Sequence, residues 1–196
     1  DRTDNDVAMA AARFLSNRSY GHVDGVAYYR YTGLRTFNGD SAGDEAEGGF
    51  DAVNNHSNTR SDAFGLSGQI SRGMPLAGRD NHLVIGAGLD SAATRFDFSA
   101  ELAHLTPDRG TIGSGLFDED EAVDLHTRTT TGSVFATNIW SASLRLALTA
   151  SARFNWTAVR LRDQIGDDLT GDHTFGRLNP AAGITFQATP RVNLYA

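Results

Sequence analysis

The chain has 196 residues, with 24 acidic and 17 basic side chains, a formal net charge of −7 and no cysteine. An acidic chain is not expected to bind nucleic acid, and a chain without cysteine has no disulfide, no thiol nucleophile and no cysteine-based zinc site. No apolar run approaches the roughly 18 residues that a membrane-spanning helix requires.

Extended segments alternate with connections along the whole chain. Strands are expected at about residues 6–16, 22–36, 63–71, 81–102, 125–139, 144–157, 174–187 and from 192 onward. The connections alternate in length, with short turns at 17–21, 73–80, 140–142 and 188–191 and long polar segments at 37–61, 105–124 and 163–172. Short turns at one end of a sheet and long loops at the other are typical of outer-membrane β-barrels.

The apolar positions of the fourth expected strand change phase partway along it. They pass from Leu83, Ile85 and Leu89 to Phe96 and Phe98, which occupy the other parity. A β-bulge between the two sets would produce this change, and so would a misplaced strand boundary.

The sixth expected strand carries the clearest pattern of the chain, because apolar and polar residues alternate from residue 144 to residue 157. An ordinary strand has about five or six residues, whereas a membrane-crossing strand needs about nine to eleven. One face ends in aromatic residues, which is typical of the membrane interface, and the other carries arginines, which a dry core would exclude. We therefore expect a lipid-facing set of Leu146, Leu148, Ala150, Ala152, Phe154 and Trp156, and a lumen-facing set of Arg145, Thr149, Ser151, Arg153 and Asn155.

More than half of the acidic residues fall in the three long connections, which predicts a strongly negative mouth. The run from Asp118 to Glu121, with Asp124, does not have the spacing of an EF-hand loop, which favours a solvated acidic loop over a calcium site. His56, His104, His126 and His173 lie in or beside the same connections, where single histidines rarely indicate a metal site. We assign no catalytic, cofactor-binding or metal-binding residue.

The last 23 residues contain a succession of short motifs, namely Leu178-Asn179-Pro180, Ala182-Gly183-Ile184-Thr185-Phe186, Thr189-Pro190 and Asn193-Leu194-Tyr195. This succession resembles the barrel wall of TonB-dependent receptors, and residues 36–40 and 150–155 are similar to segments of the same family. The resemblance spans essentially the whole chain and includes no catalytic signature.

The resemblance implies an all-β protein in which an antiparallel up-and-down meander of about eight long strands forms part of a large transmembrane β-barrel. Barrels of this kind have roughly 22 strands and a plugged lumen. Residues 1–196 would be a partial barrel domain, with the N-terminal plug and the C-terminal strands outside it. We expect residues 192–195 to be the start of a strand that continues further, as in an internal fragment of a longer receptor.

The same resemblance implies a non-enzymatic receptor in the outer membrane of a Gram-negative bacterium, which imports a scarce ligand with energy from an inner-membrane complex. An iron–siderophore complex is the favoured cargo, while cobalamin, other metal chelates and oligosaccharides stay open. The implied partners are outer-membrane lipid, the plug of the same chain, the energy-coupling complex and a metal chelate or other small ligand, with no cofactor and no nucleic acid. The alternatives are a passive porin or adhesin-type barrel and, more distantly, a soluble all-β binding module.

Overall fold

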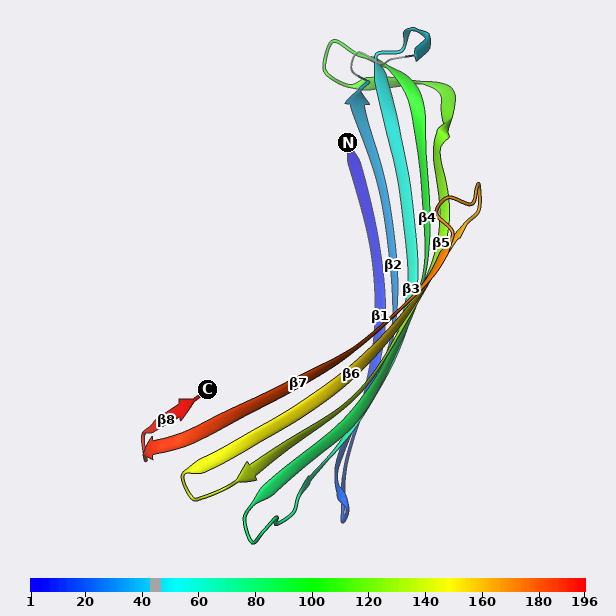
Figure 1. The fold of residues 1–196 in the computed structure, drawn as a ribbon. Helices are drawn as coiled ribbons and strands as arrows, with labels where there is room; N and C mark the ends of the chain where they lie inside the picture. Colours follow the sequence, from blue (N-terminus) through cyan, green and yellow to red (C-terminus); the bar gives the residue numbers. More distant parts are fainter. Residues whose placement is uncertain (43–46) are drawn as a thin grey trace.

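The computed structural model describes residues 1–42 and 47–196, which form one antiparallel sheet of eight strands in sequence order (Figure 1). The strands are β1 (Arg2–Arg18), β2 (Gly21–Ser41), β3 (Ala52–Gly73), β4 (Asn81–Leu105), β5 (Thr111–Ser141), β6 (Leu146–Asp163), β7 (Gly171–Thr189) and β8 (Val192–Tyr195). A single 3-10 turn, η2 (Glu47–Gly49), precedes β3 among the described residues. The structure confirms the expected all-β meander of eight strands.

The sheet is a single curled and twisted layer with no second layer against either face of the described residues (Figure 1). The buried apolar residues of this part are four alanines, Ala52, Ala63, Ala100 and Ala103. None of the described helical residues forms a helix with the length and hydropathy needed to cross a membrane. Residues 1–42 and 47–196 therefore have no core of their own, and the two faces of the sheet meet whatever surrounds it.

The strands are much longer than a bilayer requires. β3 has 22 residues, β4 has 25 and β5 has 31, while about nine to eleven residues cross the hydrocarbon layer. The end of β2, the start of β3 and the loops at 106–110 and 164–170 lie at one end of the sheet, which we call the loop end. The turns at 19–20, 74–80, 142–145 and 190–191 lie at the other, which we call the turn end.

The expected long connections were wrong in their bounds. β2 continues to Ser41 and β3 begins at Ala52, so residues 37–61 are mainly strand. β5 begins at Thr111, which places the acidic run from Asp118 to Asp124 on a strand rather than in a loop. Polar residues do not mark the end of a strand here, because the backbone pairing continues through them. The expected acidic residues Asp44 and Glu45 lie outside the described residues.

Two further expectations are corrected. Arg145 lies in the turn before β6 and not on the strand wall, because β6 begins at Leu146. No bulge separates Leu89 from Phe96, since β4 pairs continuously with β3 over this stretch. The register shifts of β4 against β5 lie further along, between Phe98 and Ala100 and between Glu101 and Ala103. The two apolar sets of β4 therefore point to opposite faces of the sheet.

Candidate functional site

Directly paired residues of an antiparallel sheet share a face, so the register assigns every strand residue to one of two faces. We name them the Leu148 face and the Thr149 face after neighbouring residues of β6. Leu148 pairs with Trp140 on β5 and Ile184 on β7. Thr149 pairs with Ile139 and Gly183.

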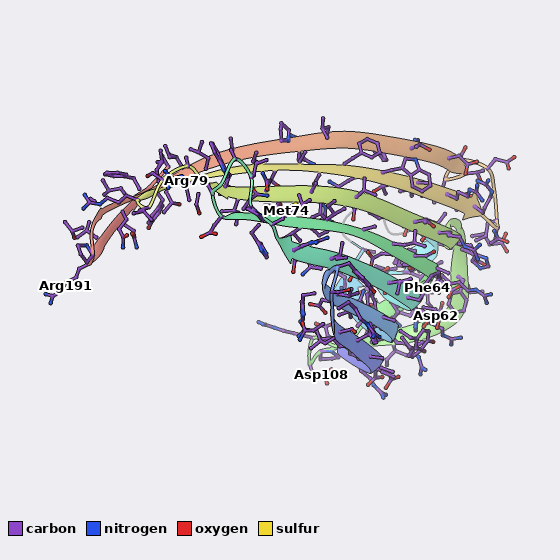
Figure 2. The ribbon with its side chains drawn as sticks, turned by 90° about the horizontal axis from the view of Figure 1, so that it is seen from below. Asp62, Phe64, Met74, Arg79, Asp108 and Arg191 are labelled. Carbon is purple, nitrogen blue, oxygen red and sulfur yellow. The ribbon has the colours of Figure 1, made fainter. Side chains whose placement is uncertain are left out.

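The Leu148 face carries a continuous apolar band from β2 to β7, which includes Phe64, labelled in Figure 2. Its exposed members are Tyr29, Phe64, Leu66, Ile85, Leu89, Val134, Leu148, Phe154, Trp156, Leu178, Ile184 and Phe186. An exposed apolar surface of this extent marks contact with a membrane or a protein partner. The six residues expected to face lipid, from Leu146 to Trp156, all lie on this face.

The Thr149 face at the same level carries hydrogen-bonded polar side chains. Thr137 and Ser151 hydroxyls lie 2.8 Å apart across β5 and β6. The Arg153 Nε donates to Asn155 Oδ1 at 2.8 Å, and its Nη2 donates to Ser133 Oγ at 3.1 Å. Of the five residues expected to face the lumen, the structure brings Thr149, Ser151, Arg153 and Asn155 onto this face.

Sequence reasoning missed a set of cross-strand contacts on the Thr149 face. The Tyr28 side chain passes over Gly65 and its hydroxyl donates to Asp90 Oδ1 at 2.6 Å, two strands away. A Cβ at Gly65 would overlap the Tyr28 ring, so only glycine leaves this path open. The ring of Phe135 covers Gly86 in the same way. These pairs become visible only when the register is known, because tyrosine and glycine lie on different strands.

These contacts surround a recess of about 390 Å³ on the Thr149 face, whose polar and aromatic lining comprises Asp24, Gln69, Asp90, Ser133, Phe135 and Arg153. Asp24 is held by Arg13, with an Nη2 to Oδ2 distance of 2.7 Å. The recess thus combines hydrogen-bond donors, acceptors and both signs of charge. Such a surface can hold polar groups of another chain segment or of a hydrated ligand.

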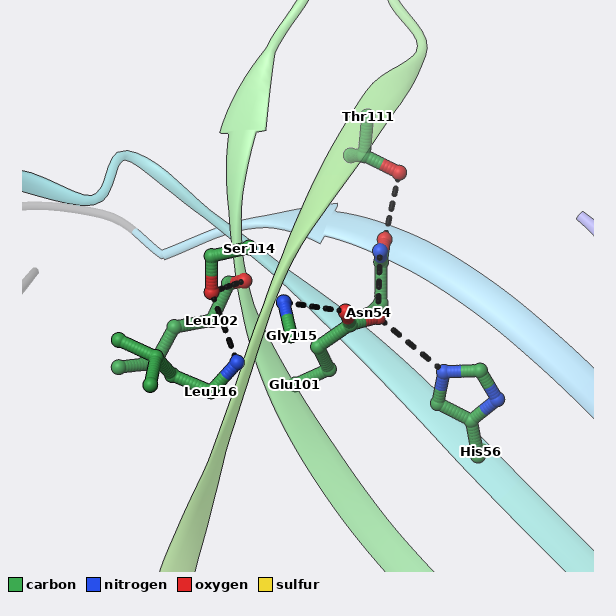
Figure 3. Close-up of polar contacts among 8 residues, drawn as sticks. All are labelled: Asn54, His56, Glu101, Leu102, Thr111, Ser114, Gly115 and Leu116. Atoms are coloured by element: carbon green, nitrogen blue, oxygen red, sulfur yellow. Dashed lines mark hydrogen bonds and ion pairs between the residues drawn. The ribbon is translucent and has the colours of Figure 1, made fainter.

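A second polar cluster closes the loop end of the sheet (Figure 3). Asn54, only 3% exposed, donates through Nδ2 to Glu101 Oε2 at 3.3 Å and accepts a hydrogen bond from the Thr111 hydroxyl. The backbone N–H of Gly115 donates to Glu101 Oε1 at 2.9 Å, and His56 Nε2 lies 3.6 Å from Glu101 Oε2. The Gly115 and Asn54 donors lower the pKa of Glu101 against the opposing effect of desolvation.

This cluster joins β3, β4 and β5 at the place where the β4–β5 register slips. The side chain of Ser114 also bridges the slip, since its hydroxyl donates to the Leu102 carbonyl at 2.6 Å and accepts from the Leu116 N–H at 3.1 Å (Figure 3). Because the polar atoms bond one another, the cluster is a clasp for the long strands rather than an open ligand site.

Other acidic residues have similar structural roles. The Asp163 carboxylate accepts the backbone N–H groups of Ile165, Gly166 and Leu169, and the first two of these loop donors contribute most to lowering its pKa. Within the described residues, no three histidine or acidic side chains gather in a way that could hold a metal ion. The acidic run on β5 and the scattered histidines therefore form no metal site in that part of the chain.

The family described as "TonB dependent receptor-like, beta-barrel" matches residues 1–196, the whole of this chain. The chain belongs to the TonB-dependent receptor family. Members of this family are non-enzymatic transporters of the Gram-negative outer membrane. The Leu148 and Thr149 faces are accordingly the two surfaces of a piece of receptor barrel.

Solved receptor structures share this fold. The unliganded ferric citrate transporter FecA superposes with a TM-score of 0.70 at 14% identity, covering 98% of this chain and 26% of its own. The ferric-catecholate import receptor Fiu from E. coli K12 superposes with a TM-score of 0.68 at 10% identity, covering 98% of this chain and 35% of its own. The ferric preacinetobactin receptor BauA from Acinetobacter baumannii superposes with a TM-score of 0.63 at 11% identity, covering 98% of this chain and 29% of its own.

The chain thus spans between a quarter and somewhat over a third of the length of these receptors. At such low identity the likeness concerns the fold alone. No curated protein matches the chain in sequence.

Proposed function

We propose that this chain supplies part of the barrel wall of an energy-coupled outer-membrane receptor that imports an iron chelate. The observation that carries the proposal is the match of the whole chain to the TonB-dependent receptor barrel. The cargo is inferred from structural neighbours that are a ferric citrate transporter, a ferric-catecholate import receptor and a ferric preacinetobactin receptor.

In this proposal the Leu148 face meets lipid and the Thr149 face lines the lumen. An apolar surface toward hydrocarbon and a polar surface toward water are what a membrane β-barrel requires. The recess beside Arg153 and Asp90 then faces the plug, which would be contributed by the same full-length protein. Its mixture of donors and acceptors suits a contact that must form and break during transport.

The loop end of the Thr149 face offers a ligand surface of different character. Its half-buried apolar side chains are Leu34, Phe96, Phe98, Val123 and Leu125, which lie together on β2, β4 and β5. Aromatic and aliphatic walls with a few polar groups are typical of small-molecule sites. We propose that this surface contacts the organic part of the chelate at the mouth of the barrel.

The test is uptake of iron by cells that carry the full-length protein as their single ferric-chelate receptor. Uptake of labelled ferric citrate or a ferric catecholate should stop when the proton-motive force is collapsed. Passage that persists without the proton-motive force would indicate a passive porin, and passage of neither chelate would overturn the proposed cargo. Replacing Phe96 and Phe98 by Ala should weaken chelate binding, whereas Ser99→Ala, on the opposite face of β4, should leave it unchanged.

A further inference from the structure

Arginines gather on the Leu148 face just beyond the apolar band, toward the loop end. The register places Arg60 directly opposite Arg95, and Arg128 directly opposite Arg160. Arg162 pairs with His126, which itself pairs with Arg95. We call this group the arginine belt, and it comprises Arg60, Arg95, Arg128, Arg160 and Arg162, all exposed.

Like charges directly opposite one another destabilise a sheet, so the belt needs an explanation. Three acidic residues near the belt have partners other than its arginines. Asp62 accepts the Tyr29 hydroxyl, Asp97 accepts Asn58 Nδ2 at 3.0 Å, and Asp124 lies 3.5 Å from His126 Nε2.

The Asp172 carboxylate pairs with two arginines of the belt. Its Oδ2 lies 2.8 Å from Arg162 Nη2, and its Oδ1 lies 3.9 Å from Arg160 Nε. In the described part of the chain, Arg60, Arg95 and Arg128 have no ion-pair partner. A surplus of positive charge therefore remains on β3, β4 and β5.

The unpaired arginines border a groove of about 450 Å³. The side chains that reach it from the Leu148 face are Tyr31, Arg60, Asp62, Arg95, His126 and Arg128. A planar guanidinium binds phosphate through two parallel hydrogen bonds, and several such groups around one groove would share a single phosphate.

The position of the groove along the strands fits a lipid headgroup. Arg60 lies four residues beyond Phe64, and Arg160 four residues beyond Trp156, which is about 13 Å along a strand. Aromatic residues of a membrane barrel mark the level where hydrocarbon meets headgroups. The arginine belt begins where the apolar band ends, at the height expected for charged headgroups.

A second groove, apolar and about 620 Å³ in volume, lies over β1 to β4 and closer to the turn end, while the cationic groove lies over β2 to β5. Its walls on the Leu148 face include Phe14, Val23, Ala27, Leu66, Ala87 and Leu89. Glycines at positions 25 and 68 keep its floor low. Leu66 follows Arg60 by six residues in β3, which places it about 20 Å closer to the turn end. A cationic groove and an apolar groove thus follow one another on neighbouring strands.

We propose that the arginine belt binds the phosphate of a phosphate-bearing lipid in the outer leaflet, with an acyl chain of that lipid in the apolar groove. The bound phosphate neutralises the Arg60–Arg95 repulsion and fixes this part of the wall in the membrane. This function is separate from transport, so it holds for any cargo.

The test uses the full-length receptor in nanodiscs of phosphatidylcholine with or without phosphatidic acid, and native mass spectrometry counts the retained lipids. Wild-type protein should retain phosphatidic acid in preference to phosphatidylcholine. Replacing Arg60, Arg95 and Arg128 together by Gln should reduce this preference on the order of 100-fold, since each arginine near anionic lipid contributes about fivefold.

The matched control is Arg30→Gln, because Arg30 pairs with Ala63 and so carries its charge on the Thr149 face, three residues from the level of Arg60. It should leave lipid retention unchanged. If the triple variant does not assemble, Arg95→Gln alone should still lower the preference about fivefold. Gly68→Leu should weaken lipid retention by filling the apolar groove without changing any charge.

Equal retention by the wild type and the arginine variants would overturn the proposal. Inorganic phosphate, added as competitor, separates the two possible sources of the anion. If it displaces phosphatidic acid completely at equal concentration, or if Gly68→Leu has no effect, the belt is a free-anion site and the lipid assignment is wrong.

Discussion

The same strands have opposite polarity in the two halves of the sheet. Near the turn end, the Leu148 face is apolar, with Leu66, Leu89 and Phe154, while the Thr149 face carries Arg153 and Asp90. Near the loop end the arrangement is inverted, because the Leu148 face carries the arginine belt and the Thr149 face carries apolar side chains such as Leu34, Phe96 and Phe98.

The backbone pairing is the same on both sides of this inversion of polarity. β3 and β4 pair without interruption from Ala52 and Ala103 to Gly73 and His82, through the level where polarity changes. The hydrogen-bond ladder stays constant through this level, and we propose that the medium on each side of the wall sets the side-chain pattern. In β4 the switch falls between Leu89 and Arg95, which we take as the outer limit of the hydrocarbon layer.

The largest effect is expected from a charge placed on the apolar half of the Leu148 face. Ala152 lies near the middle of the apolar run of β6, so Ala152→Arg should destabilise the full-length receptor by about 2–4 kcal/mol. The measurement is denaturant-dependent refolding into lipid bilayers.

Its matched control is Ser151→Arg, on the adjacent position of the opposite face. This change removes the hydrogen bond with Thr137 and should cost only about 1 kcal/mol. Similar penalties for the two variants would mean that the faces do not meet different media.

A smaller effect is expected from filling the space over Gly65. Gly65→Ala forces Tyr28 away from Asp90 and should destabilise the sheet by about 1–3 kcal/mol, as overpacking generally does. Gly132→Ala is the control, because its added Cβ would meet only an ordinary contact with Trp156 at 3.7 Å. The comparison is the difference in unfolding midpoint, and an unchanged midpoint for Gly65→Ala would contradict the crossing contact.

The smallest effect concerns the clasp at the loop end. Glu101→Gln weakens the charge-assisted hydrogen bonds from Gly115 and Asn54 and should lower local stability by about 1.5 kcal/mol at neutral pH. The pKa of Glu101 is lowered in the folded state, so its contribution is present above the ordinary value of 4.5 and is lost as pH falls through the folded pKa.

Hydrogen exchange of residues 111–116 at a series of pH values measures this contribution. Wild-type protection should decrease on acidification, while protection in the Glu101→Gln variant should vary less with pH. The same pH profile in both proteins would show that Glu101 does not hold the β4–β5 slip.

Much of this fold follows from alternation alone. The period-two pattern from Leu146 to Trp156 predicted a long strand with one apolar face, and the turn residues separated eight strands in the correct order. The predicted bounds of the strands were wrong toward the loop end. There polar and acidic residues such as Asp118 and Glu121 lie on strands, because both surfaces of the extended wall meet water and the sequence no longer contrasts strand with loop.

The phase change of β4 was read from the sequence, but its cause was not. The sequence left a bulge or a misplaced strand boundary as explanations, and the continuous register of β4 against β3 excludes a bulge between the two apolar sets. The sets lie on opposite faces of one uninterrupted strand. The Tyr28–Gly65–Asp90 crossing and the arginine belt were likewise invisible, since each joins residues that lie far apart along the chain and meet only through strand pairing.

Single spin labels would show whether the medium around the wall changes at one level of the sheet. The chain has no cysteine, so cysteines introduced one at a time along β4 would be the only labelling sites in these residues. In the full-length receptor in lipid, labels at positions 83, 85 and 89 should be accessible to oxygen, and labels at 84 and 88, on the Thr149 face, to a water-soluble relaxation agent. From position 95 onward, the labels on the Leu148 face should become accessible to the water-soluble agent. Oxygen accessibility that continues past position 95 on the Leu148 face, or that is equal on both faces between positions 83 and 89, would contradict this change of medium.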